Sequence, residues 1–194
     1  MTMLDPRLPE LDAGPYVLRP FRLGDAAALV EAGRDPLIPL ITTVPAAGGL
    51  EERGAYVRRQ WGRLEEGLGW SWAIGEPSVG SLVGQIGLWP RGGMDERNEN
   101  VTGGHGARVA TSGYWVLPSK QGRRAAAWAL EAVVRWGFES AGLDRVELAI
   151  DPTNTGSIHT AQRVGFVCED GIQRWEEIGG VSRALDVYVL EAGV

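Results

Sequence analysis

The sequence predicts a mixed α/β domain in which one pair of parallel strands lies within an otherwise antiparallel sheet. Two observations predict this class. A strand, a long amphipathic helix and a second strand follow one another between residues 113 and 150, and such a crossover makes the two strands parallel. Elsewhere, short strand-like runs are joined by tight turns, which makes their neighbours antiparallel. The 194 residues fit a single domain, 1–194, with residues 1–14 as a loosely ordered N-terminal segment.

The first half of the chain alternates strand-like runs with helices. Runs rich in aromatic and β-branched residues, bounded by Gly and Pro, predict the strands. A loop rich in Pro and small residues leads to the second helix, and a long glycine-rich loop at 91–108 closes this half. In order, we expect a strand at Tyr16–Leu23, a short helix from Asp25 to Gly33, a helix at Glu51–Glu66, and a hairpin of strands Trp70–Gly75 and Ser81–Trp89.

The second half has a more regular pattern. Its long helix carries apolar or small residues at i, i+3, i+4 and i+7 positions, and Gly142 is a natural C-terminal stop. The strand after it alternates apolar and polar residues. In order, we expect a strand at Gly113–Leu117 ended by Pro118, a helix at Gly122–Ala141, a strand at Arg145–Ile150, a short helix at Thr155–Val164, and strands at Phe166–Asp170 and Ala184–Leu190.

Composition excludes several classes of protein. A net charge of −6 and a pI near 5.0 argue against non-specific nucleic-acid binding. No apolar run is long enough to cross a bilayer, and the first residues do not resemble a signal peptide, so we expect no membrane association and a cytoplasmic location. The lone Cys168 excludes an internal disulfide and a thiolate zinc cluster, and we expect no metal.

The turn and helix start at residues 118–126 can bind an anion. A helix N-terminus exposes unpaired backbone N–H groups and the positive end of the helix dipole. Small residues at 122, 125 and 126 let the backbone approach a phosphate, and basic residues at 120, 123 and 124 add positive charge. On these residues alone, a helix start with solvated basic side chains is the better interpretation. Neither a P-loop nor a G-x-G-x-x-G fingerprint is present.

A second segment of interest runs from Asp151 to Ile158 and is followed by Val164-Gly165-Phe166. Asn154 and Thr155 are natural helix caps. Ser157 lies in the first turn of the same helix, where a hydroxyl is more often solvated than functional. By themselves these residues indicate only a capped helix.

Together, in this order and spacing, the two segments resemble the GNAT superfamily of N-acetyltransferases, in particular its RimJ/RimL-like branch. The resemblance spans roughly residues 16–190 and is densest after Gly113. It is carried by Leu18-Arg19-Pro20-Phe21-Arg22-x-x-Asp25, Gly113-Tyr114-Trp115-Val116-Leu117-Pro118, Gln121-Gly122-Arg123-Arg124-Ala125-Ala126, Arg145-Val146-Glu147-Leu148, Asp151-Pro152-x-Asn154-x-x-Ser157 and Val164-Gly165-Phe166.

The resemblance implies a bent sheet, flanked by helices, whose two central parallel strands splay apart to admit acetyl-CoA. Pantetheine would run along the strand that ends at Val116 and Leu117, and Asn154 would contact it. Ser157 corresponds to a residue that in some members returns a proton to the departing thiolate. The diphosphate would lie on the backbone of the turn formed by Gln121, Gly122, Arg123, Arg124, Ala125 and Ala126.

The sequence departs from the family pattern at two places. Arg124 stands where the family has glycine, and its side chain could either pair with a CoA phosphate or crowd the diphosphate. Many relatives have a Glu just before Gly-Tyr-Trp, where this chain has Thr111-Ser112, and neither can act as a base. We take His105 as the first candidate base, because its unperturbed pKa suits the task. The acids of the same loop, Asp95, Glu96 and Glu99, and proton loss through water are the alternatives.

The expected reaction is acetyl transfer from acetyl-CoA to a primary amine by direct attack in a ternary complex. Backbone N–H groups near Val116 would polarise the thioester carbonyl. The acceptor would be a protein N-terminus or a small amine. The alternative is a catalytically inactive CoA-binding module that acts as a sensor or partner domain. A homodimer is compatible with the resemblance, since related proteins occur as monomers and dimers.

Overall fold

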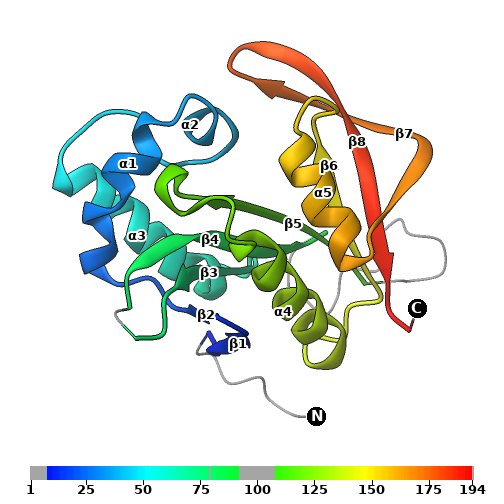
Figure 1. Ribbon diagram of the computed structural model, residues 1–194, viewed down its shortest axis with the longest axis horizontal. Coiled ribbons are helices and arrows are strands. Elements are labelled where there is room, and N and C mark those ends of the chain that lie inside the picture. Colours follow the sequence, from blue (N-terminus) through cyan, green and yellow to red (C-terminus); the bar gives the residue numbers. More distant parts are fainter. Residues whose placement is uncertain (1–7, 79, 92–107, 194) are drawn as a thin grey trace.

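The computed structural model describes residues 8–78, 80–91 and 108–193 (Figure 1). These residues form one sheet with the strand order β1-β2-β3-β4-β5-β6-β8-β7. The strands are β1 (Leu11–Ala13), β2 (Tyr16–Arg19), β3 (Trp70–Gly75), β4 (Leu82–Pro90), β5 (Val109–Val116), β6 (Arg145–Ile150), β7 (Val167–Ile178) and β8 (Val181–Glu191). The helices are η1 (Leu23–Ala27), α1 (Leu29–Arg34), α2 (Ile38–Ile41), α3 (Leu50–Glu65), η2 (Pro118–Lys120), α4 (Ala125–Glu139) and α5 (Thr155–Val164).

The predicted mixed α/β class is confirmed. Strand β5 pairs with β6 in parallel, and all the other neighbouring strands of the sheet are antiparallel. The parallel ladder is short, because it joins only Val109 with Arg145, Ala110 with Val146 and Thr111 with Glu147. Beyond Thr111 and Glu147 the two strands diverge. We call this point the fork, and it opens the centre of the sheet.

Hydrophobic cores lie on both faces of the sheet. Alternation along β3 sends Trp70 and Trp72 towards α4 and sends Ala73 towards α3. Trp136 of α4 packs edge-on against both tryptophans, with ring centroids 5.0 and 5.2 Å apart. On the other face, Tyr56 of α3 lies in the second core. Helices α4 and α5 lie side by side (Figure 1), so both helices that follow the forked strands are packed together.

Three predicted boundaries in the first half differ from the structure. The first strand ends at Arg19 rather than Leu23, since Pro20 lacks the N–H group that a ladder needs. The prediction of a loosely ordered segment through residue 14 is wrong for Leu11–Ala13, which form β1 across a tight turn where Asp12 Oδ1 accepts from the Gly14 N–H at 2.8 Å. The loop expected before α3 contains α2.

The second half differs mainly at the start of α4 and along β7. Helix α4 starts at Ala125 instead of Gly122, because Gly122 (φ 75°) and Arg124 (φ 60°) have left-handed backbones. Strand β5 starts at Val109, directly after the expected loop and before the expected start at Gly113. Strand β7 continues to Ile178, well beyond the predicted end at Asp170, and turns into β8 through Gly179-Gly180.

Candidate active site

A cleft of about 750 Å³ opens at the fork. Its walls come from the diverging parts of β5 and β6, the start of α5, helices α2 and α3, and the β7–β8 hairpin. Because β5 and β6 are parallel, α4 and α5 both begin beyond the carboxyl ends of the forked strands. Two helix N-termini, with their unpaired N–H groups, therefore follow the same end of the fork.

The start of α5 borders the cleft, where Asn154 and Ser157 both line the wall. Asn154 is the N-cap, and its Oδ1 accepts from the Ser157 N–H at 3.1 Å. The Tyr114 hydroxyl donates to the Ser157 carbonyl at 3.4 Å, which ties this helix start to β5. Burial raises the pKa of Tyr114, so its hydroxyl stays protonated. The structure thus places Asn154 and Ser157 beside β5 at the cleft.

The turn of the predicted diphosphate site follows the end of β5, outside the lining of the cleft. Val116 is the last residue of β5, and its carbonyl accepts from Gln121 Nε2 at 3.3 Å. The Tyr16 hydroxyl donates to the Arg123 carbonyl at 3.2 Å, which ties the turn to β2. Space around Gly122 is open. Four of the turn residues, Gln121, Gly122, Arg123 and Arg124, are exposed, whereas Leu117 and Ala125 are buried and Ala126 is half-buried.

Neighbouring acids hold the preceding η2 segment. Ser119 donates from both its N–H and its hydroxyl to the Glu31 carboxylate, at 2.7 and 2.9 Å. Lys120 pairs with Glu76 at 3.0 Å. The positive charge of Lys120 is therefore already compensated, and the exposed guanidinium groups of Arg123 and Arg124 are the cations of this turn that face solvent.

The residues at the position of the family Glu are structural. Thr111 donates its hydroxyl to the Trp89 carbonyl at 3.4 Å, and Ser112 donates to the Gly87 carbonyl at 2.9 Å. The first candidate base, His105, lies outside the described residues. The same holds for the alternatives at 95, 96 and 99.

Two carboxylates line the described part of the cleft, Asp151 and Glu176. Asp151 accepts from the N–H and hydroxyl groups of Thr153 at 2.9 and 2.6 Å, and from Arg183 at 2.9 Å. These contacts, led by the Thr153 hydroxyl, lower the pKa of Asp151 and commit it to the turn after β6. Glu176 lies on β7 and is exposed. Sequence reasoning missed it, although Gly179-Gly180 signalled a hairpin that reaches this far.

The opposite wall carries a buried polar chain. The Tyr56 hydroxyl donates to Gln85 Oε1 at 3.3 Å, and Gln85 Nε2 donates to the Ser71 hydroxyl at 3.0 Å. Ser71 in turn donates to Gln60 Oε1 at 3.0 Å. Burial raises the pKa of Tyr56 to about 12. The four side chains of this polar chain are uncharged near pH 7, so they can orient a substrate but cannot take its proton.

Within residues 8–78, 80–91 and 108–193, no group of three or more acidic, histidine or cysteine side chains is placed to hold a metal ion. Among the helices of those same segments, none has the length and apolar character that spanning a membrane requires.

Comparisons relate the chain to known proteins. The family model of the acetyltransferase (GNAT) domain matches residues 16–167. A Bacillus subtilis protein named YkkB is 28% identical over 116 residues, which are 59% of this chain and 61% of that protein, less than two thirds of its length. Mycobacterium smegmatis RimJ in complex with CoA-disulfide has a TM-score of 0.72 and 26% identity, over 95% of this chain and 86% of that one. The ribosomal-protein-S5-alanine acetyltransferase of Vibrio fischeri has a TM-score of 0.70 and 17% identity, over 95% and 97% of the chains, a likeness of fold alone.

Proposed function

This chain belongs to the GNAT acetyltransferase family, and on that premise we propose that it moves an acetyl group from acetyl-CoA to a primary amine by direct attack within a ternary complex. The fork carries this proposal. It leaves one edge of β5 without a strand partner from Ser112 to Val116, next to a cleft and two helix starts.

The residues around the fork fit the shape and charge of acetyl-CoA. The open edge of β5, which ends at Val116 and Leu117, offers backbone groups to the amides of pantetheine. Asn154 faces the same gap. The turn from Gln121 to Ala126 offers the free N–H groups at the start of α4, open space at Gly122 and two exposed arginines to a diphosphate. Arg124 is exposed, which favours pairing with a CoA phosphate over crowding.

Proton transfer is assigned to Glu176 and Ser157. The amine must lose a proton before its lone pair forms the C–N bond and the C–S bond breaks. Among the described cleft residues, Asp151 is committed to its turn and the tyrosines stay protonated, so Glu176 is the acceptor that remains. Its neighbours Arg174 and Arg183 are each paired with another carboxylate. Ser157 would donate a proton to the leaving thiolate. His105 remains a candidate base, as does transfer through water.

The acceptor is expected to be a protein N-terminus or a small amine. The Vibrio fischeri neighbour is named for a ribosomal-protein acceptor, which favours a protein acceptor here. We also expect a cytoplasmic location and propose that the chain can form a homodimer.

A catalytically inactive CoA-binding module is the second candidate, favoured by Thr111 and Ser112 at the position of the family acid. Calorimetry with CoA, together with thiol release from acetyl-CoA across spermidine and short peptides with free N-termini, separates the two. Binding with turnover supports the enzyme. Binding without turnover on any amine supports the module, and no binding contradicts both.

A further inference from the structure

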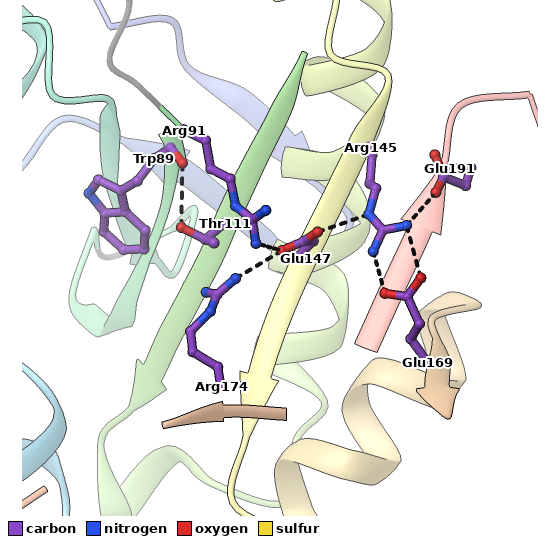
Figure 2. Close-up of polar contacts among 8 residues, drawn as sticks. All are labelled: Trp89, Arg91, Thr111, Arg145, Glu147, Glu169, Arg174 and Glu191. Carbon is purple, nitrogen blue, oxygen red and sulfur yellow. Dashed lines mark hydrogen bonds and ion pairs between the residues drawn. The ribbon is translucent and has the colours of Figure 1, made fainter. Parts of the chain in front are cut away.

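Glu147 is a buried carboxylate at the fork that the proposed chemistry does not use. It is 3% exposed and lies on β6, opposite Thr111 in the last pair of the parallel ladder. Its Oε1 accepts from Arg145 Nε at 2.9 Å, and its Oε2 accepts from Arg174 Nη2 at 2.9 Å and from Arg91. Figure 2 shows the carboxylate between these guanidinium groups, with both oxygens occupied.

The arginines reach Glu147 from separate parts of the sheet. Arg91 follows β4, and its N–H donates to the Val109 carbonyl at 2.8 Å. Arg145 begins β6 and also pairs with Glu169 and Glu191, on β7 and β8 (Figure 2). Arg174 lies on β7 and lines the cleft. One carboxylate therefore links the end of β4, the fork and the hairpin.

The hairpin needs such a link, because its outer part leaves the sheet. Strand β8 pairs with β6 from Asp186 to Glu191, so residues 181–185 have no partner on that side. The β7 ladder is interrupted: residues 169–172 lie between the pairs Cys168–Tyr188 and Gln173–Asp186. Residues 173–185, which we call the outer ribbon, are thus an isolated two-stranded hairpin, and such hairpins are marginally stable by themselves.

Side chains hold the outer ribbon in place at its base, its middle and its tip. At the tip, a Cβ on Gly179 would lie 3.4 Å from the Leu40 side chain of α2. In the middle, Arg183 pairs with Asp151 at 2.9 Å, but their side chains are 47% and 20% exposed, so this pair contributes little. At the base, Arg174 reaches the buried Glu147, where water screens the attraction far less. The base is the strongest of the three anchors.

We propose that Glu147 and Arg174 are positioning residues that hold the outer ribbon over the acceptor side of the cleft. Glu176 is two residues beyond Arg174, so both side chains lie on the same face of β7, and both line the cleft. The anchor at Arg174 therefore fixes where Glu176 stands relative to the amine. This inference rests on the proposed function for its kinetic consequence, but its structural consequence is independent of turnover.

The test is Arg174→Gln, with Gln173→Ala as the matched control. Arg174→Gln leaves Glu147 with two arginines, so no buried charge is stranded. Gln173→Ala removes a hydrogen bond from the same ribbon to Asp186, at 3.0 Å, and keeps the anchor. With spermidine or a short peptide as acceptor, Arg174→Gln should lower kcat/KM for the amine by roughly 10- to 100-fold. KM for acetyl-CoA should stay within about 2-fold, because the cofactor turn is elsewhere. Arg174→Lys should restore part of the loss.

Amide hydrogen exchange provides the readout that needs no activity. Exchange in residues 173–185 should become on the order of 10-fold faster in Arg174→Gln and stay unchanged in α4. Unchanged exchange in the ribbon would overturn the inference, as would a loss shared equally by the amine and acetyl-CoA parameters. If exchange in residues 173–185 becomes faster in Arg174→Gln but the wild type acetylates no amine, the role of the anchor is supported and the proposed function is contradicted.

Discussion

The proposed cofactor side and the proposed acceptor side of the fork are built in different ways. The cofactor side consists of consecutive residues, in which β5, the turn at 121–126 and α4 follow one another, and the backbone would supply the binding groups. The acceptor side is assembled from α2, α3 and the outer ribbon, far apart in the chain, and side chains hold it together. A site built from backbone groups tolerates substitutions of its side chains but not changes of its backbone conformation. A site held together by side chains is instead sensitive to single side-chain substitutions.

The largest expected effect is on the acceptor side. Glu176→Gln removes the proton acceptor but keeps the shape of the side chain, so kcat should fall by about 100-fold, the usual scale of general acid–base catalysis. KM for acetyl-CoA should not change. Glu177→Gln is the matched control, because Glu177 is exposed and does not line the cleft. Steady-state kinetics that show equal activity in both variants would leave His105 or water as the route of the proton.

The buried wall of the acceptor side should make stability depend on alkaline pH. Burial raises the pKa of Tyr56 to about 12 in the folded chain, against 10.0 for an ordinary tyrosine. The contribution of the protonated Tyr56 hydroxyl to the unfolding free energy is therefore complete below pH 10, and it is lost as the pH rises towards 12. Between pH 9 and pH 11 the wild type should lose about 1.4 kcal/mol more unfolding free energy than Tyr56→Phe. Urea denaturation at both pH values measures the difference, and parallel losses would contradict it.

A smaller effect is expected where the two sides meet, at the start of α5. Asn154→Ala removes the cap that accepts from the Ser157 N–H, so it should destabilise the protein by about 1 kcal/mol and also weaken acetyl-CoA use. Ser157→Ala keeps that N–H, so its stability should match the wild type while its turnover falls. Thermal unfolding and steady-state kinetics on both variants separate the effect on helix capping from the effect on turnover. Equal stability of the two variants would mean that the cap is dispensable.

The smallest effects are expected on the cofactor side, and they should have opposite signs. Gly122→Ala places a Cβ at φ 75° in open space, so backbone strain alone should cost about 1 kcal/mol of stability. Arg124→Gly relieves the strain of an arginine at φ 60° and should be neutral or stabilising by about 0.5 kcal/mol. Calorimetry should nevertheless find weaker CoA binding in Arg124→Gly. Tighter binding would mean that the arginine crowds the diphosphate.

The two sides also differ in how far the sequence predicts them. The family and the mixed sheet follow from local signals between Gly113 and Phe166, and both are confirmed. The start of α4 at Ala125 was missed by three residues, because a left-handed Arg124 breaks the rule that only small or amide-bearing residues adopt that conformation.

The acceptor side could not be predicted in the same way. Residues 173–178 are mostly exposed on both faces of the outer ribbon, so they lack the alternation that identifies a strand. In the sequence, Glu147 is only a polar residue within the alternating pattern of the strand at Arg145–Ile150. Its role depends on Arg91 and Arg174, which lie 56 and 27 positions away along the chain and meet it only in the fold.

The short parallel ladder leaves one edge of β5 open, while β4 pairs with the other edge up to Val116. Five residues, from Ser112 to Val116, extend past the last pair with β6, an open edge of about 16 Å at roughly 3.3 Å per residue. Because β4 fixes the backbone of these residues, the open edge is preformed, and a ligand that pairs with it would not have to order the strand first.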